Sequence, residues 1–197
     1  MAVLNQPTSV RKLAAILSAD IAAYSALMGA DEEGTVRKLR EVREAVLPNI
    51  EKFGGRIIDL AGDGILAEFP SAVRAVESAT AVQRCMAELN AQREPAMLFR
   101  IGVNAGDVIH EGERLYGDGI NVAARLQAIA EPGCICISNK VHEEVRDRVA
   151  LAFTDMGDQQ LKNIARPVPA FSTSAHESTS ESKEAWLKAK KPDFQRR

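Results

Sequence analysis

The sequence is poor in cysteine and histidine, and each shortage argues against a class of protein. Its 197 residues include three cysteines and three histidines. Three thiols form no even disulfide set, and neither residue type has the spacing of a zinc site. We expect reduced, mostly buried thiols, with Cys134 and Cys136 alternating in a buried strand. A disulfide-stapled scaffold and a histidine metal centre are therefore not indicated.

The chain also lacks long apolar runs and an excess of charge of either sign. No run approaches the roughly 20 residues of a membrane span, and the N-terminus lacks the layout of a secretory signal. The formal net charge is -2 and the pI is about 6.0, so the total charge does not indicate nucleic acid or an anionic membrane as a partner. We expect a cytoplasmic protein that binds neither.

Hydrophobic residues make up 46% of the chain, enough for the core of one domain of ordinary size. From Thr173 the composition shifts to serine, threonine, glutamate and lysine, which predicts a mobile tail. We therefore divide the chain into an N-terminal segment, a single domain and this tail, at residues 1–11, 12–172 and 173–197.

Hydrophobic periodicity predicts alternating strands and amphipathic helices. An apolar run over 11–19 ends in Asp20, and the helical pattern that follows is stopped by Gly54 and Gly55 and should be kinked or divided by Pro48. The order strand, helix, strand, strand, helix, strand predicts an α+β fold with a ferredoxin-like βαββαβ core. The predicted core elements lie at 11–19, 36–53, 56–60, 65–69, 71–89 and 98–103. A C-terminal extension follows, with a helix from residue 118, a strand around 134, a helix near 141–149 and a last strand pair.

One segment after a glycine-rich turn carries the strongest chemical signal. Between Leu115 and Leu126, the amide of Asn121 and the guanidinium of Arg125 lie one helical turn apart and share one helix face. Asp118 is the expected N-cap, so both side chains should point from the first turns of the helix into one pocket. Such donors suit an anionic ligand.

This segment, read with Asp20 in Ser-Ala-Asp-Ile and Asp63 in Ala-Gly-Asp-Gly, resembles the catalytic domain of bacterial class III adenylate and guanylate cyclases. The resemblance covers residues 12–171. It implies that Asp20 and Asp63, with the backbone of Ile21, hold two Mg²⁺ or Mn²⁺ ions, which prefer hard oxygen ligands. From the residues alone, Asp20 also suits a helix cap and Asp63 also suits a turn.

The same resemblance implies a reaction and a set of roles. A nucleoside triphosphate would be converted into a 3′,5′-cyclic nucleotide, cAMP or cGMP, and pyrophosphate, for intracellular signalling. Asn121 would orient the ribose and Arg125 would contact the α-phosphate. Lys162 lies where the family often keeps a phosphate-binding lysine, although a solvated surface lysine fits the sequence equally well. Because the family takes the metal acids from one subunit and the Asn and Arg from the other, a homodimer with composite sites is expected.

Two positions depart from the family's pattern for reading adenine. Adenylate cyclases usually have a lysine where this chain has Asp59, and an aspartate or threonine where it has Arg114. Three outcomes stay open. Asp59 and Arg114 read the edge of guanine, or they pair with each other and leave a loose site, or they block the pocket.

Two other functions compete with the cyclase hypothesis. A catalytically silent cyclase-like domain, which binds nucleotide or pairs with a partner, fits the altered base positions. Such domains, however, usually lose a metal acid or the Asn and Arg pair, and this chain has all four. Polymerase palms and diguanylate cyclases share the split core, but they would show a Gly-Gly-Asp/Glu-Glu/Phe type of hairpin in place of residues 61–64. A basic groove for nucleic acid is also lacking.

Overall fold

A computed structural model describes residues 10–91, 96–112 and 114–173 of the chain. The predicted N-terminal segment up to residue 9 and the predicted tail from residue 174 onward lie outside the described residues. Thr173, the first residue of that predicted tail, is 3% exposed, and its backbone N–H donates to the carbonyl of Ile135 at 3.0 Å. This residue therefore belongs to the folded body of the chain.

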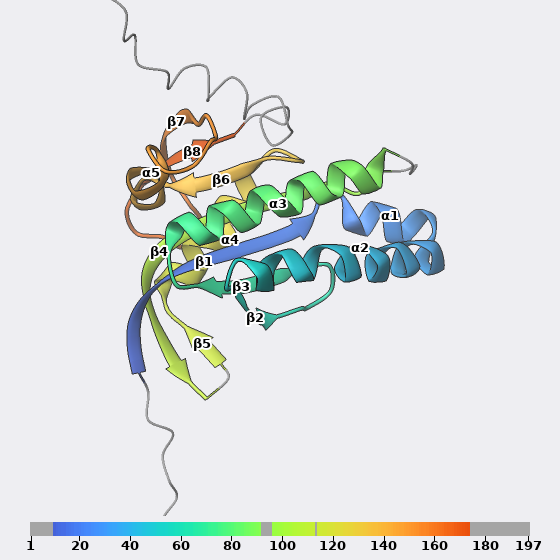
Figure 1. The fold of residues 1–197 in the computed structure, drawn as a ribbon, viewed down its shortest axis with the longest axis horizontal. Coiled ribbons are helices and arrows are strands. Elements are labelled where there is room, and N and C mark those ends of the chain that lie inside the picture. Colours follow the sequence, from blue (N-terminus) through green and yellow to red (C-terminus); the bar gives the residue numbers. More distant parts are fainter. Residues whose placement is uncertain (1–9, 92–95, 113, 174–197) are drawn as a thin grey trace, which may run out of the picture.

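An eight-stranded sheet forms the centre of the fold, in the order β2-β3-β1-β4-β6-β8-β7, with β5 paired to β4 (Figure 1). Neighbouring strands are antiparallel, apart from β4 and β6, which run parallel. The strands are β1 (Val10–Ile21), β2 (Arg56–Asp59), β3 (Ile65–Phe69), β4 (Phe99–Glu111), β5 (Arg114–Tyr116), β6 (Ile135–Ser138), β7 (Thr154–Gln159) and β8 (Val168–Ser172).

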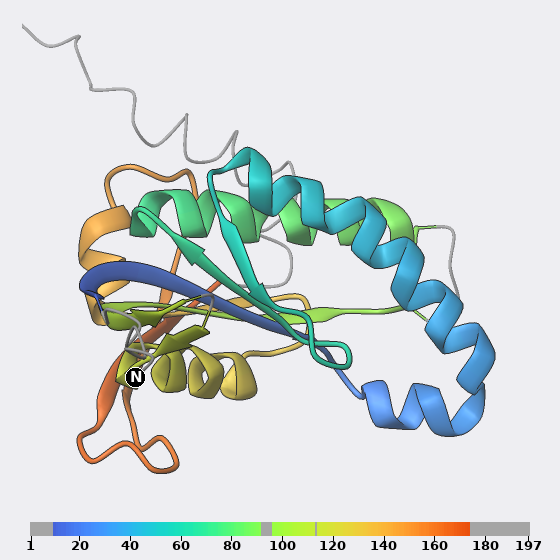
Figure 2. The same cartoon turned by 90° about the horizontal axis from the view of Figure 1, so that it is seen from below.

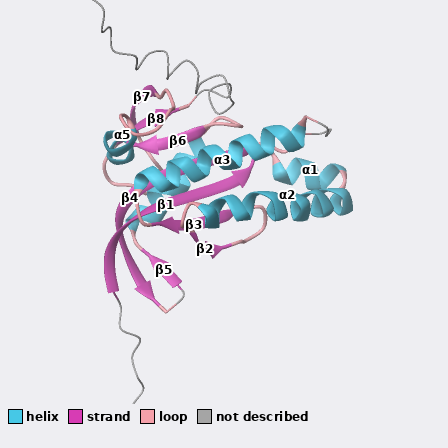
Figure 3. Cartoon of the chain, in the orientation of Figure 1, coloured by secondary structure: helices cyan, strands magenta, loops and turns pink. Residues whose placement is uncertain are grey.

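Helices lie on both faces of the sheet but cover them unequally. α2 and α3 pack side by side on one face, whereas α4 lies on the opposite face against β4, β1 and β6 (Figures 2 and 3). The helices are α1 (Tyr24–Ala30), α2 (Glu32–Lys52), α3 (Ala72–Asn90), α4 (Asp118–Ile129) and α5 (Asn139–Val145). The predicted α+β class, the order of the core elements and the C-terminal extension are confirmed.

None of the helices in the described residues is long and apolar enough to cross a membrane.

Pro48 does not divide its helix, because α2 runs unbroken over Glu32–Lys52. Proline lacks the N–H that would bond to the carbonyl of Glu44, four residues earlier. Both residues are exposed, so water can satisfy that carbonyl, while Val46 and Ile50 are fully buried on either side of the proline. Packing of the helix against the core therefore outweighs the loss of one backbone hydrogen bond.

Side chains along β1 alternate between the two faces of the sheet. Residues Ala15, Leu17, Ala19 and Ile21 belong to the large core that includes α2 and α3. Ile16 belongs instead to a smaller cluster that includes Ala123 of α4. Because successive side chains on a strand point to opposite faces, Asp20 lies on the α4 face.

α4 lies so close to β4 that a glycine is required between them. A Cβ atom on Gly102 would come within 2.2 Å of the Ala123 carbonyl oxygen and 2.3 Å of the Gln127 nitrogen. Both atoms belong to the backbone of α4, which cannot swing aside as the tip of a flexible side chain can. Gly102 therefore fixes how closely α4, with Asn121 and Arg125, approaches the sheet.

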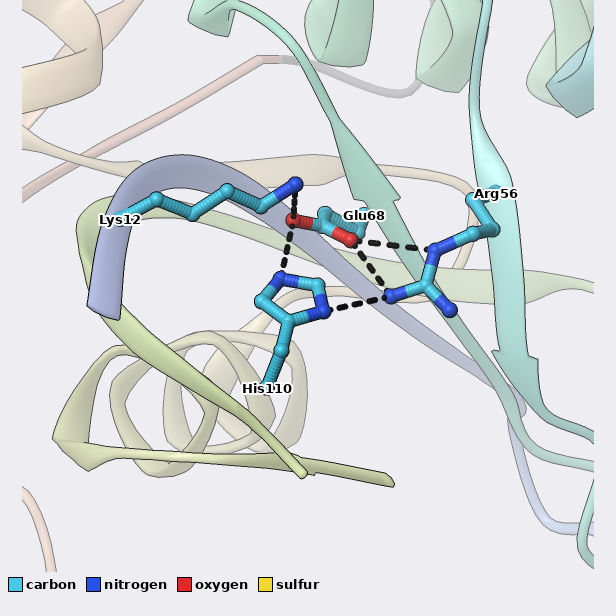
Figure 4. Close-up of polar contacts among 4 residues, drawn as sticks. All are labelled: Lys12, Arg56, Glu68 and His110. Atoms are coloured by element: carbon cyan, nitrogen blue, oxygen red, sulfur yellow. Dashed lines mark hydrogen bonds and ion pairs between the residues drawn. The ribbon is translucent and has the colours of Figure 1, made fainter. Parts of the chain in front are cut away.

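A buried carboxylate connects four strands on the α4 face of the sheet (Figure 4). The side chain of Glu68 on β3 is 5% exposed, and its oxygens lie 2.8 Å from Lys12 Nζ, 2.8 Å from Arg56 Nη2 and 3.0 Å from His110 Nε2. Burial by itself would raise the pKa of Glu68. Hydrogen bonds from Lys12, Arg56 and His110, with the charge of Lys12, outweigh it and lower this pKa. The ionised carboxylate therefore stabilises the joint between β1, β2, β3 and β4.

We expect Gly102→Ala to lower the free energy of unfolding by about 1–3 kcal/mol, the usual cost of overpacking beside a rigid backbone. Gly29→Ala in α1 is the matched control, because a Cβ there would meet nothing within 4 Å. Thermal unfolding followed by circular dichroism measures both variants. A Gly102→Ala unfolding temperature equal to that of the wild type would contradict the close α4–β4 contact.

We expect Glu68→Gln to lower the free energy of unfolding by about 2–3 kcal/mol near neutral pH, because the half-exposed cations of Lys12 and Arg56 lose the buried, charged acceptor that they share. The lowered pKa of Glu68 means that this contribution is present above the ordinary value of 4.5 and is lost as the pH falls below it. The difference between wild type and variant should therefore shrink on acidification, which urea unfolding at neutral and acidic pH measures.

Glu77→Gln is the control for this measurement. The side chain of Glu77 is 37% exposed and pairs with Arg74 at 3.4 Å within α3. Such surface pairs contribute about 0–1 kcal/mol, so this variant should stay close to the wild type at every pH. A Glu68→Gln difference that is constant from neutral to acidic pH would show that the charge of Glu68 does not stabilise the fold.

Candidate active site

Asp20 lies at the end of β1, directly opposite Arg100 on β4. Its two carboxylate oxygens accept hydrogen bonds from Arg100, at 2.9 Å from Nε and 2.6 Å from Nη2. These bonds raise the pKa of Arg100; partial burial opposes the rise, and the negative charges of Asp20 and Asp63 add to it. Arg100 therefore stays positively charged between two carboxylates.

Asp63 is connected to the end of β1 through the backbone. Its Oδ2 atom accepts a hydrogen bond from the N–H of Ile21 at 2.8 Å. Within the described residues its Oδ1 atom has no hydrogen-bond partner. This single bond brings the carboxylate of Asp63 beside the residue that follows Asp20, as the predicted pairing of the two acids requires.

The turn that carries Asp63 is held in place from α2. Gly62 has a φ of 58°, in the left-handed region that glycine adopts at little cost. Arg43 donates from Nη2 to the carbonyl of Leu60 at 3.1 Å and also to the carbonyl of Gly62. The turn is therefore fixed on one side by β1 and on the other by α2.

These donors fit a divalent cation that a substrate completes. Among the described residues there is no group of three or more His, Cys, Asp and Glu side chains suited to a metal ion. Two carboxylates and a backbone carbonyl, from Asp20, Asp63 and Ile21, are hard oxygen donors. Mg²⁺ and Mn²⁺ accept such donors while keeping waters and binding phosphate oxygens. The chemistry of the set fits an open metal site better than a closed, all-protein one.

α4 carries Asn121 and Arg125 as predicted, but its N-cap is not Asp118. The cap is Gly117, with a φ of 138°, and Asp118 is the first helical residue. A Cβ at Gly117 would come within 2.7 Å of the Asp107 carbonyl oxygen, so the close approach of β4 requires glycine at the cap. Asp118 still places a negative charge in the first turn, where it complements the helix dipole.

Asn121 and Arg125 lie on the outer side of α4. Ala123 and Leu126 are fully buried against the sheet, whereas Asn121 is exposed and Arg125 is half-buried. Arg125 Nε donates to the backbone carbonyl of Lys162 at 3.1 Å. The fold therefore brings Arg125 close to Lys162. It also turns Asn121 and Arg125 away from the sheet.

Asp59 and Arg114 each make local contacts. Asp59 Oδ1 accepts from the N–H of the next residue, Leu60, at 2.9 Å. A hydrogen bond with Tyr116 raises the pKa of the exposed Arg114, and the charge of Glu111 adds to the rise. In the part of the chain that the structure describes, no ion pair joins Asp59 to Arg114. Both side chains are exposed to solvent.

No direct polar contact joins the two halves of the predicted site in the described residues. Within the described ranges, no hydrogen bond or ion pair links Asp20 or Asp63 to Asn121 or Arg125. A cavity of about 790 Å³ opens beside the first turn of α4, between β4 and the β7–β8 loop, but none of these four residues lines it. The cavity is therefore not the place where the predicted residues meet.

The predicted set omits Arg100 and Arg43, which hold Asp20 and the Asp63 turn. A signal for Arg100 exists in the sequence, since it alternates with the apolar residues Phe99 and Ile101 and so lies on the face opposite the main core. Arg43 lies on the polar side of a long amphipathic helix, where arginine is common. Arg43 differs from an ordinary surface arginine only because the β2–β3 turn passes beside α2 within its reach.

The comparisons with known proteins agree with one another. The sequence matches the family described as Adenylate and Guanylate cyclase catalytic domain over residues 11–175. A Rhizobium meliloti (strain 1021) protein named "Putative adenylate cyclase 3" is 44% identical over 174 residues, which are 87% of this chain and 30% of that protein. The chain thus spans about a third of the length of this relative.

Solved structures give the same result. An adenylate/guanylate cyclase/hydrolase from Silicibacter pomeroyi has 41% sequence identity and a TM-score of 0.79, covering 84% of this chain and 98% of that chain. The guanylyl cyclase Cya2 has 26% identity and a TM-score of 0.73, covering 84% of this chain and 93% of that chain. Since the family match spans most of the sequence and the same fold surrounds both acids and both α4 donors, this chain belongs to the adenylate and guanylate cyclase catalytic domain family, class III.

Proposed function

We propose that this chain converts a nucleoside triphosphate into its 3′,5′-cyclic monophosphate and pyrophosphate. The observation that carries the proposal is the hydrogen bond from the Ile21 N–H to Asp63 Oδ2, 2.8 Å long, which holds Asp63 beside the end of β1 that carries Asp20. A silent nucleotide-binding domain would not need two carboxylates held in this way. Family membership supports the same reaction.

Asp20, Asp63 and the Ile21 carbonyl would hold Mg²⁺ or Mn²⁺. Such ions, when bound, activate the ribose 3′-hydroxyl and neutralise charge on the triphosphate. The contribution of the chain itself is positional, because the sheet fixes Asp20 while Ile21 and Arg43 fix the Asp63 turn. Cation affinity should therefore depend on the hydrogen bonds that hold this turn as well as on the carboxylates.

Arg125 and Asn121 would act on the phosphate and the ribose. The bond from Arg125 Nε to the Lys162 carbonyl orients the guanidinium, and within the described residues its Nη atoms have no hydrogen-bond partner. These donors are therefore available for the charge that develops on the α-phosphate oxygens during in-line attack. The Asn121 amide, one helical turn earlier, would orient the ribose. The exposed Lys162 amine would contact the outer phosphates.

A homodimer would unite the two halves of the site. The acids lie at the end of β1, whereas Asn121 and Arg125 point outward from α4, so a second copy must bring its α4 to the acids of the first. α4 contacts β4, β1 and β6, and the face of β2 and β3 on that side has no helix over it in the described chain (Figure 2). A two-fold axis would then create two equivalent composite sites.

ATP is the proposed substrate, with GTP as the alternative. Adenine offers an N6 donor and an N1 acceptor, and Asp59 and Arg114 supply one acceptor and one donor, so an exchanged acid and base can still read it. The name of the 44% identical relative supports ATP. Guanine, with donors at N1 and N2 and an acceptor at O6, suits the same pair and supports the alternative.

Product analysis tests this function. We expect the purified chain with Mn²⁺ to form a single cyclic product, cAMP, when ATP, GTP, CTP and UTP are supplied separately. Asp63→Ala should lower turnover at least about 100-fold, because it removes a ligand for the charge-stabilising ions. Unchanged metal-dependent turnover in Asp63→Ala would refute the metal assignment. Nucleotide binding without any product from the wild type would favour the silent domain.

Complementation tests the shared site. Asp20→Ala and Asn121→Ala chains should each be nearly inactive alone, since each homodimer lacks one half of both sites. A mixture should regain up to about a quarter of wild-type activity, because half of the dimers are mixed and each holds one complete site. Chromatography of differently tagged chains shows whether mixed dimers form. Background activity in a preparation that contains them would contradict the composite site.

A further inference from the structure

We propose that Arg100 is a resident cation of the metal site, which holds the Asp20 carboxylate when no divalent ion is bound and weakens the binding of that ion. Arg100 is thus a positioning residue for Asp20, and its positive charge lowers the affinity of the site for a divalent ion. This inference rests on the metal role proposed above for Asp20 and Asp63, and it adds what regulates that site.

The first support is the geometry of the ion pair. Both carboxylate oxygens of Asp20 already accept hydrogen bonds from Arg100, at 2.9 Å and 2.6 Å. Bidentate pairs of this kind are the strong ones among protein hydrogen bonds. A divalent ion that binds Asp20 must share these oxygens with the guanidinium or displace at least one of its two bonds. Asp63 differs, because its Oδ1 atom has no such competitor in the described residues.

The second support is the charge of the site. Asp20 and Asp63 together carry two negative charges, and Arg100 cancels one of them. The side chains of Arg100 and Asp20 are only 29% and 26% exposed, so water and salt screen this charge incompletely. Asp20, Asp63 and Arg100 therefore present a net charge of about −1 to a free divalent ion. The positive charge of Arg100 lies close to that ion and repels it.

The third support is the fixed position of Arg100 in the sheet. Arg100 pairs directly with Asp20 in the antiparallel register of β4 and β1. Its neighbours Phe99 and Ile101 are fully buried on the opposite face, so the strand cannot rotate to carry the guanidinium away. Displacement by a metal ion must therefore occur through the arginine side chain itself, with the backbone unchanged.

A functional consequence follows for the order of binding. A triphosphate brings about four negative charges, which offset the positive charge of Arg100 and restore the attraction for divalent ions. The metal ion should therefore bind weakly to the nucleotide-free protein and strongly together with the nucleotide. Arg100 in this way couples occupation of the metal site to the presence of substrate.

The test measures Mn²⁺ binding to the nucleotide-free chain, by electron paramagnetic resonance of the free ion. We expect Arg100→Gln to bind Mn²⁺ at least about tenfold more tightly than the wild type, because the repelling charge is removed. Arg100→Lys keeps the charge and should stay within about threefold of the wild type. Arg74→Gln is the matched control, since it changes the net charge equally but lies in an exposed pair on α3.

The outcomes separate this inference from the proposed function. If Asp63→Ala weakens Mn²⁺ binding while Arg100→Gln binds no more tightly than the wild type, the metal site stands and the role of Arg100 is overturned. If neither the wild type nor Arg100→Gln binds Mn²⁺ more tightly than Asp63→Ala, the metal assignment fails and the inference fails with it.

A measurement on the wild-type chain covers the case in which Arg100→Gln does not fold. The ¹H–¹⁵N resonance of Arg100 Nε is identified by its absence from Arg100→Lys. Titration with diamagnetic Mg²⁺ should shift this resonance, because the ion alters the bond from Nε to Asp20 Oδ1. A purely structural ion pair would leave it in place, and an unshifted resonance at saturating Mg²⁺ would overturn the proposal.

Discussion

The antiparallel pairing of β1 with β4 is the constraint on which the site depends. Twelve residue pairs join the two strands, from Val10 opposite His110 to Ile21 opposite Phe99. This register places Asp20 opposite Arg100 at one end. A register shift of one residue would send every side chain of β1 to the wrong face. The large core on the α2 and α3 side prevents such a shift, because it would expose residues that are now buried.

Three arginines hold the candidate site, one through a carboxylate and two through backbone carbonyls. Arg100 binds the carboxylate of Asp20, Arg43 binds backbone carbonyls of the turn before Asp63, and Arg125 binds the backbone carbonyl of Lys162. Guanidinium groups suit this work because they are planar, permanently charged and rich in donors. The same property makes Arg100 a competitor for any cation that approaches Asp20. The ion pair between Arg100 and Asp20 therefore both positions the Asp20 carboxylate and lowers its affinity for a cation.

On the α4 face of the sheet, different residues stabilise the fold and set the geometry of the candidate site. The Glu68 cluster joins β1, β2, β3 and β4 through a buried carboxylate, without taking part in the predicted site. Gly102 lets the backbone of α4 rest directly on β4, and Gly117 allows the chain to turn into that helix. Burial raises the pKa of Cys136 to about 12, so this thiol stays protonated near neutral pH. The acids and the α4 donors are thus carried by a rigid frame.

Much of the fold could be predicted from the sequence, because it depends on patterns that repeat over short distances. The order of the core elements and the two acidic positions follow from apolar periodicity and short motifs. The end of a helix or strand does not follow from local patterns where contact with a neighbouring element sets it. β4 extends to Glu111 because β1 pairs with it as far as His110 and its last three residues pair with β5. α2 continues through Pro48 because residues on both sides of the proline pack on the core.

By itself, the sequence determined the fold class and the family resemblance, and it singled out Asp20, Asp63, Asn121 and Arg125 as candidate site residues, because these depend on residue type and spacing along one chain. Only the tertiary structure decided that Arg100 binds the Asp20 carboxylate and that Arg43 binds the turn before Asp63. It also decided that Gly117 caps α4 in place of Asp118. Each of these depends on a contact between segments far apart in sequence, or on how closely two backbones approach. Such distances are set by the packing of the whole domain and leave no local pattern in the chain.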